Sequence, residues 1–192
     1  MTSQDILNLL KQTNALLEGH FVLTSGLHSP QYVEKFRLLE QPKITESLCK
    51  ELAEKFKDEN VTVVVGPMTG GIILAYEVGK QLGTKAIFTE RFDGRMKFRR
   101  GFSLNKDDRV LIVEDIITTG GSVQEVIEAI NELGAKIIGI GCLVDRSNDK
   151  AKFPYPFKPL LKLDVAAWKQ DDCPLCKENV AITKPGSTNK NN

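Results

Sequence analysis

The sequence has no apolar run that approaches membrane-spanning length, and its N-terminus lacks a basic region followed by an apolar one. It also has little net charge, since 26 Lys and Arg stand against 25 Asp and Glu. Net charge therefore gives no reason to expect a nucleic-acid or membrane partner. Four cysteines in 192 residues do not suggest a disulfide scaffold. We expect a cytoplasmic protein.

The chain also lacks internal repeats, and 192 residues is a usual length for one domain. Hydrophobic residues make up 41% and charged residues 27%, as in ordinary globular proteins. The only segment of biased composition is the tail, residues 186–192, which we expect to be disordered. Residues 1–192 are therefore predicted to form a single domain.

The most informative stretch is residues 110–122. Val110 to Val113 is an unbroken apolar run, typical of a strand buried on both faces of a parallel sheet. Two acids and then a series of small residues follow it. A helical pattern begins at Ser122, with apolar residues at steps of three and four, and Gly134 is well placed to end it. The stretch predicts a strand, a small-residue loop and a helix whose N-terminus opens onto the loop.

This geometry is suited to a phosphate. The first turn of a helix has unpaired N–H groups and a partial positive charge. Gly120 and Gly121 allow close approach of the backbone, and the absence of Lys distinguishes the loop from a nucleotide P-loop. Glu114 and Asp115 are suited to accept hydrogen bonds from vicinal hydroxyls. In isolation such a pair would more often end a strand and cap a turn; in this ordered run we favour a ribose 5-phosphate site.

The run closely resembles the phosphoribosyl pyrophosphate (PRPP) motif of type I phosphoribosyltransferases, and the surrounding chain resembles the orotate-specific members. The resemblance implies that Glu114 and Asp115 hold the ribose hydroxyls and stabilise an oxocarbenium-like transition state, so that Asp115 counts as catalytic. It implies a PRPP-binding loop formed by Glu114, Asp115, Ile116, Ile117, Thr118, Thr119, Gly120, Gly121 and Ser122. Mg²⁺ is expected to arrive with PRPP, bound by substrate oxygens and water and by no dedicated protein ligand.

The N-terminal segment carries a helical stripe over residues 3–17, which we expect Gly19 to end. Residues 19–33 predict a hairpin or a strand with a Ser-Gly turn. In the family a Ser-Gly-x-x-Ser-Pro segment belongs to a hood over the base. The resemblance implies that His28 contacts PRPP, in place of a Lys found in many members, and that Tyr32 stacks on orotate. From the residues alone, His28 is equally compatible with a surface turn.

A second strand, Gly-rich loop and helix follow one another from residue 61, after a helix that starts at Pro42. The loop is residues 66–71, and a structural turn is as compatible with it as an anion site. The resemblance places this loop against the pyrophosphate, with Thr69 and Gly70 as PRPP contacts. Many members have a Lys where Gly70 stands, so one expected cation is missing.

Residues 91–102 contain five cations against one acid, Asp93. A flexible cationic loop neutralises the charge of a leaving pyrophosphate and excludes water when it closes. The resemblance makes this segment the catalytic lid, which reaches the partner subunit's site in a homodimer. The candidates are Arg91, Lys97, Arg99 and Arg100, and the His of the usual lid is absent.

Asp145 and Arg146 follow a buried strand predicted over residues 135–144, and ligands of open α/β sheets gather at such strand ends. A surface ion pair is the simpler interpretation of the two residues alone. The resemblance implies that Arg146 binds the orotate carboxylate and that Thr118 also orients orotate.

Near the C-terminus, residues 160–165 predict an edge strand, and Cys173 and Cys176 form a Cys-x-x-Cys pair. One such pair supplies half of a tetrahedral zinc site, and the other ligands would have to come from Cys142, a His or a dimer partner. A redox role is also open. We favour a structural turn.

Together these patterns predict an α/β fold with a mainly parallel central sheet flanked by helices, the type I phosphoribosyltransferase fold. We expect a small N-terminal hood (residues 1–40), an α/β core (41–165) and a C-terminal extension (166–192). The expected reaction transfers phosphoribose from PRPP to orotate. A purine or uracil phosphoribosyltransferase would lack the hood and Asp145-Arg146. A non-catalytic PRPP-sensing regulator would usually lack the cationic loop and carry a DNA-binding domain, for which one N-terminal helix is too little.

Overall fold

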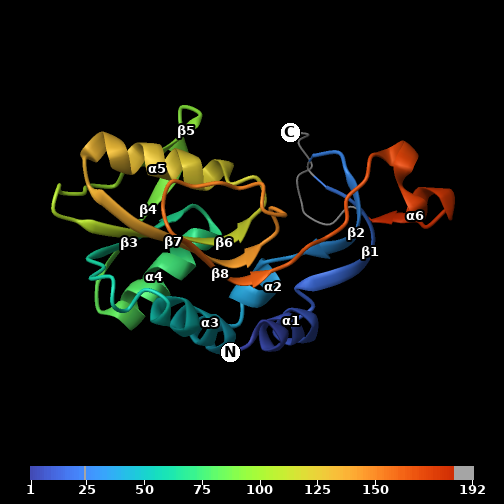
Figure 1. Cartoon of the computed structure of the whole chain (residues 1–192), viewed down its shortest axis with the longest axis horizontal. Helices are drawn as coiled ribbons and strands as arrows, with labels where there is room; N and C mark the ends of the chain where they lie inside the picture. The colour runs from blue at the N-terminus through green and yellow to red at the C-terminus, as the bar shows by residue number, and fades with distance from the viewer. Residues whose placement is uncertain (24, 184–192) are drawn as a thin grey trace.

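The computed structural model describes residues 1–23 and 25–183, and its largest element is a six-stranded sheet of order β5-β4-β3-β6-β7-β8 (Figure 1). All neighbouring strands in it are parallel except β5, which runs antiparallel to β4. This confirms the predicted α/β class and its mainly parallel sheet. The strands are β3 (Val63–Pro67), β4 (Lys85–Phe92), β5 (Arg95–Phe98), β6 (Arg109–Ile117), β7 (Lys136–Asp145) and β8 (Phe157–Lys162).

Helices cover both faces of this sheet (Figure 1). On one face lie α3 (Pro42–Glu54) and α4 (Gly70–Leu82), and on the other lies α5 (Gly121–Leu133). Residues of β6 alternate between the two sides, so that Leu111 packs in the core under α3 and α4 while Ile112 packs in the core under α5. Burial on both faces explains why the strand is an unbroken apolar run.

A smaller sheet of order β2-β1-β9 forms the hood, separate from the central sheet (Figure 1). The predicted hairpin is present as β1 (Leu16–Val22) and β2 (His28–Val33). Strand β9 (Ile182–Thr183) comes from the C-terminal extension and pairs in parallel with β1. Two short helical turns, η1 (Gln170–Asp172) and α6 (Pro174–Lys177), precede β9. The hood is therefore built from both ends of the described chain.

The predicted N-terminal helix is shorter than its apolar stripe. Helix α1 spans Ser3–Gln12 and is followed by Asn14 in a left-handed conformation at φ 54°. Leu16 and Leu17, which continue the helical spacing, belong to β1 instead. The expectation that the helix runs to Gly19 was wrong because the stripe passes from one element into the next.

The cationic segment also differs from its predicted form. Residues 91–98, expected to lie in a flexible loop, pair as the β4–β5 hairpin, with Asp93 and Gly94 at positive φ in its turn. Met96 of β5 is buried in the core beneath α5, which fixes the hairpin. A four-residue helix, α2 (Phe36–Leu39), connects the hood to α3. The predicted edge strand is β8, and the tail expected to be disordered, residues 186–192, lies outside the described residues.

Within the described part of the chain, no helix combines the length and the apolar character needed to cross a membrane.

Candidate active site

The loop between β6 and α5 forms a small hollow lined by Glu114 and residues 116–123. Gly120 is the N-cap of α5, at φ 80°, where a residue with a side chain would be strained. The N-cap residue supplies no side-chain cap to this helix end. The Gly121 N–H donates to Thr119 Oγ1 at 3.4 Å, and the other N–H groups of the first turn are free among the described residues. This is the geometry predicted for an anion site, and Thr118, Thr119 and Ser122 lie around it.

The two acids of the motif are buried at the end of β6, with Glu114 8% exposed and Asp115 2% exposed. Glu114 Oε1 accepts a hydrogen bond from the Asp115 N–H, and Asp115 Oδ1 accepts one from the Ile116 N–H. Burial raises the pKa of both carboxyl groups, and the neighbouring Asp115 charge raises the pKa of Glu114 further. A ligand that donates hydrogen bonds to these two carboxylates would stabilise their charged form, which burial disfavours.

Lys35 is a site residue that the sequence did not reveal. Its Nζ donates a hydrogen bond to Asp115 Oδ1 at 3.0 Å and lies 2.9 Å from Oδ2. This positive charge opposes the effect of burial on the pKa of Asp115, and the same contact raises the pKa of Lys35. Lys35 is the residue before α2, 80 positions away in the chain, and a lone Lys after a strand has no pattern that would have identified it.

The second Gly-rich loop meets the same carboxylate. Helix α4 begins at Gly70, directly after Thr69, and β3 lies beside β6, so the two loops are neighbours. Asp115 Oδ2 occupies the place where a Cβ on Gly70 would be. The structure therefore brings Thr69 and Gly70 to the predicted PRPP loop, and it leaves no room for a side chain at position 70.

Arg146 lies at the matching end of the next strand. Ile117 and Asp145 are register partners in β6 and β7, and the Arg146 N–H donates to the Ile117 carbonyl at 2.8 Å. Arg146 therefore sits beside Thr118. Asp145 accepts a hydrogen bond from the Ser147 N–H instead of pairing with Arg146, so the simple ion-pair interpretation is wrong.

The Arg146 guanidinium is half-buried, and burial lowers its pKa. Its Nε is fully buried and has no hydrogen-bond partner within residues 1–23 and 25–183. Tyr32 of the hood is near enough for the two charges to interact, and the pKa of Tyr32 is raised chiefly by burial. The structure thus places Arg146 beside Thr118, and the Arg146 charge is felt at Tyr32, the third residue predicted to hold the base.

The candidate cations of the hairpin are paired with the chain's own acids. Arg91 binds Glu125 of α5 at 2.9 Å. Arg100 and Arg99 flank Glu90, at 3.1 and 3.7 Å. Lys97 lies 3.6 Å from Asp93. The count of acids within residues 91–102 left out two partners. Glu90 stands just before the segment, and Glu125 lies in α5.

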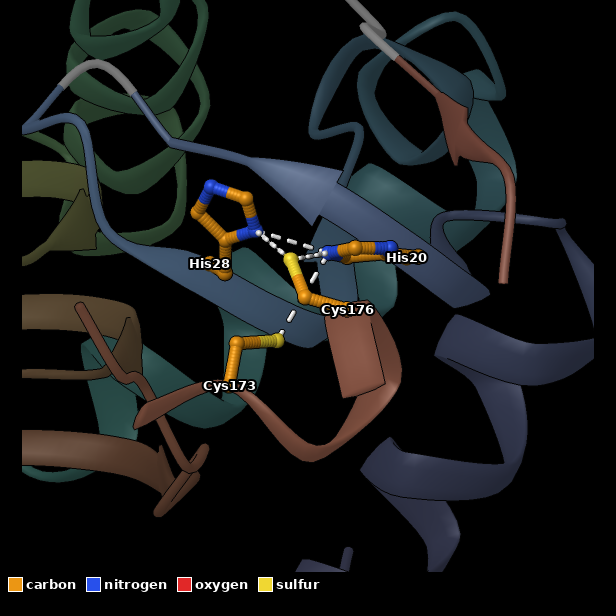
Figure 2. A group of neighbouring side chains, drawn as sticks. All are labelled: His20, His28, Cys173 and Cys176. Atoms are coloured by element: carbon orange, nitrogen blue, oxygen red, sulfur yellow. Dashed lines mark hydrogen bonds between the residues drawn. The ribbon is translucent and has the colours of Figure 1, made fainter. Parts of the chain in front are cut away.

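His28, predicted to contact PRPP, lies in the hood with its side chain buried. Its Nδ1 lies 2.7 Å from His20 Nε2 and 3.3 Å from Cys176 Sγ (Figure 2). Cys173 completes this group. Cys142, which the sequence offered as a further zinc ligand, is buried in β7 and is not a member of it.

Comparison with known proteins places these features in one family. A family model described as "Phosphoribosyl transferase domain" matches residues 37–173. The orotate phosphoribosyltransferase of Caldanaerobacter subterraneus subsp. tengcongensis is 47% identical over 187 residues, 97% of this chain and 98% of the relative. That of Caldicellulosiruptor bescii is 45% identical over 190 residues, 99% of this chain and all of the relative.

Solved structures agree on the fold. Orotate phosphoribosyltransferase from Aeropyrum pernix superimposes with a TM-score of 0.67 at 26% identity, over 82% of this chain and 93% of that one. The Mycobacterium tuberculosis H37Rv enzyme in complex with inorganic phosphate gives a TM-score of 0.69 at 22% identity, over 84% and 95% of the two chains.

Proposed function

Because this chain belongs to the orotate phosphoribosyltransferase family and has that family's activity in pyrimidine synthesis, we propose how its residues divide the work. The reaction transfers phosphoribose from PRPP to orotate and yields orotidine 5′-monophosphate and pyrophosphate. The observation that supports the assignment most directly is the junction of β6 and α5, where two buried carboxyls adjoin a helix N-terminus without a side-chain cap. This combination fits a sugar phosphate.

The 5′-phosphate of PRPP binds at the start of α5. The free N–H groups of the first turn and the hydroxyls of Thr118, Thr119 and Ser122 supply the donors. Ile116, Ile117, Gly120 and Gly121 hold the loop in shape. A compact loop of this size encloses a phosphate rather than a base.

Glu114 and Asp115 accept hydrogen bonds from the ribose hydroxyls. As positive charge develops on the sugar, the nearby carboxylates stabilise it, and the Lys35 charge favours the ionised form of Asp115 against the effect of burial. The family uses PRPP with Mg²⁺, which neutralises charge on the pyrophosphate. The carboxylate oxygens of Glu114 and Asp115 are of the kind that bind Mg²⁺. Because Asp115 is already bonded to Lys35, substrate oxygens and water would supply most of the Mg²⁺ ligands.

Orotate lies between the end of β7 and the hood. Arg146, whose Nε has no partner among the described residues, binds the orotate carboxylate, and the Tyr32 ring packs against the base. Thr118 orients orotate from the PRPP side. A base without a carboxylate would leave the half-buried Arg146 charge unpaired, which favours orotate over purines and uracil.

The cationic segment of residues 91–102, which contains the turn and second strand of the β4–β5 hairpin, acts as the lid. Arg91, Lys97, Arg99 and Arg100 exchange their bonds to the chain's own acids for bonds to the leaving pyrophosphate. We further propose a homodimer in which each lid reaches the other subunit's site. Exposed apolar side chains at Met68, Ile73 and Tyr76 line the surface next to the second Gly-rich loop and support this assembly.

Pyrophosphate release from PRPP and Mg²⁺ tests the proposal, with orotate, uracil, hypoxanthine, guanine and adenine as acceptors. We expect turnover with orotate alone. Turnover with another base would keep the PRPP site and reject the roles of Arg146 and Tyr32. Tight PRPP binding without turnover would instead indicate a PRPP sensor.

A further inference from the structure

Four side chains with metal-binding atoms meet in the hood. They are His20 of β1, His28 of β2, and Cys173 and Cys176 of the C-terminal extension (Figure 2). Their ligand atoms all lie within 4.8 Å of one another. His20, His28 and Cys173 are at most 3% exposed. Groups that are this polar and this reactive are rarely gathered in a buried position unless something binds them.

The distances fit a tetrahedral ion. Zinc lies about 2.0–2.1 Å from His nitrogen and about 2.3 Å from Cys sulfur, which sets neighbouring N and S ligands about 3.5 Å apart. His20 Nε2 lies 3.6 Å from Cys173 Sγ and 3.7 Å from Cys176 Sγ. His28 Nδ1 lies 3.3 Å from Cys176 Sγ. The two His nitrogens, 2.7 Å apart, need to separate by roughly 0.6 Å to reach the tetrahedral spacing.

The proton positions also favour an ion. His20 Nδ1 lies 2.7 Å from the Val180 carbonyl, which can only accept, so Nδ1 carries the proton. Nε2 therefore presents its lone pair to the centre of the cluster. Fixing a His tautomer through the far nitrogen in this way is the usual outer contact of a metal-bound imidazole.

We propose that His20, His28, Cys173 and Cys176 form a structural Zn²⁺ site that joins the N-terminal hood to the C-terminal extension. Four protein ligands close the coordination shell, as in structural rather than catalytic zinc sites, and two thiolates with two imidazoles select zinc over magnesium. On binding, the two thiols become thiolates and the released protons pass to solvent. No electron transfer is involved. The site is independent of the catalytic assignments above, and a His28 bound to zinc is not available as a cation for PRPP.

Backbone contacts around the cluster show which segments the ion would join, namely the β1–β2 hairpin and the C-terminal extension. His28 and Trp168 exchange both backbone hydrogen bonds, at 2.8 and 2.9 Å, and β9 pairs with β1 at His20 and Ile182. These contacts flank the two cysteines in the chain. They consist of one bridge and a two-residue strand, which are weak attachments by themselves. A zinc cross-link between residues about 150 positions apart would strengthen them by closing a long loop.

Metal analysis of the purified full chain tests the site. We expect about one zinc ion per chain in the wild type and in the control Cys49→Ala, which removes a buried thiol elsewhere in the core. The double variant Cys173→Ser/Cys176→Ser should retain none. Wild-type protein that stays free of zinc after incubation with Zn²⁺ under reducing conditions would overturn the proposal, as would zinc retained by the double variant.

Cobalt substitution of the wild type gives a readout that does not depend on how well a variant folds. Tetrahedral Co²⁺ with two thiolates should show intense visible d–d bands and sulfur-to-metal charge-transfer absorption. Chelation should lower the Tm of the wild type and of Cys49→Ala, and leave the Tm of the double variant unchanged. A spectrum of octahedral Co²⁺, or a Cys173–Cys176 disulfide in the protein as isolated, would overturn the assignment.

Discussion

Asp115 fills the space that a side chain on Gly70 would need. The carboxylate is held there by Lys35, which comes from the hood side of the site. The second Gly-rich loop contains no cation, and Lys35 contacts the motif's own acid. The positive charge beside this loop therefore comes from the segment just before α2.

Substitution at Gly70 should displace Asp115. We expect Gly70→Ala to destabilise the protein by about 1–3 kcal/mol, because the new Cβ has no free space, and to weaken PRPP binding. Denaturant unfolding and PRPP titration measure the two effects. Gly121→Ala is the control for stability, since its Cβ would meet only Thr119 Oγ1 at 3.6 Å. If Gly70→Ala binds PRPP as the wild type does, the carboxylate has no fixed role there.

Lys35→Met should destabilise the protein at neutral pH by about 1–2 kcal/mol, because Asp115 would remain buried without its cation. The expected loss is smaller than for a fully buried pair, because Lys35 is partly exposed. Adding Asp115→Asn should recover much of that loss in unfolding experiments. Arg37→Ala removes an exposed pair with Glu40 and should change stability little. Equal losses in Lys35→Met and Arg37→Ala would mean that the Lys35 pair is a surface contact.

Glu114 should make the protein less stable as pH rises. Its pKa is raised from 4.5, so above that pH the folded chain keeps a proton that the unfolded chain has lost. Stability from this group is complete below pH 4.5 and declines as pH climbs toward the raised value. Glu114→Gln should therefore gain stability relative to wild type between about pH 5 and about pH 8 in denaturant unfolding. A constant difference across this range would contradict the raised pKa.

PRPP binding should release protons. Hydrogen bonds from ribose hydroxyls favour the charged form of Glu114, and so lower its pKa toward the ordinary value. Calorimetric titrations of PRPP and Mg²⁺ in buffers of different ionisation enthalpy measure this release. We expect a smaller release from Glu114→Gln. Net proton uptake by the wild type would place the ribose hydroxyls elsewhere.

Arg146→Ala should raise KM for orotate at least about 100-fold, because the charge-assisted bond to the carboxylate is lost. The Kd for PRPP should stay within about threefold, since the 5′-phosphate loop is untouched. Arg146→Lys keeps the charge but loses the planar guanidinium, so its KM for orotate should lie between that of the wild type and that of Arg146→Ala. Steady-state kinetics and PRPP titration separate these effects. A matched loss of PRPP affinity would show that Arg146 supports the whole site and not the base alone.

Arg100→Ala should lower kcat about 100-fold if the lid acts on the leaving pyrophosphate. Its stability should change only modestly, because Arg100 is well exposed and the buried Glu90 keeps Arg99 at 3.7 Å as a second cation. Arg95→Ala, in the same cationic segment, is the matched control and should keep most of the activity. Wild-type kcat in Arg100→Ala would remove Arg100 from the catalytic set.

The parts of the fold that the sequence predicted well are those in which one local pattern decides the structure. The apolar run from Val110, the Gly-rich loop and the stripe after Ser122 became β6, the loop that leads into α5, and α5 itself. The stripe through Leu16 and Leu17 was misleading because Leu fits a buried helix and a buried strand equally well, and only pairing with β2 decides between them.

What the sequence left out depends on contacts between distant segments. Lys35 gains its role from a strand end 80 residues later, and His20 meets cysteines about 150 residues away. Glu90 and Glu125 neutralise the cationic hairpin from outside the segment in which charges were counted. Residue spacing along the chain does not predict these contacts, because they form only when the fold brings distant segments together.

The pairing of β9 with β1 also fixes an order of assembly on the ribosome. The central sheet is complete once β8 has emerged at Lys162, but the hood lacks its third strand until Ile182 and Thr183 follow. Strand β1 therefore leaves the ribosome well before β9, with which it pairs. A nascent chain stalled after β8 would hold the strands of the central sheet beside a hood sheet that lacks one strand.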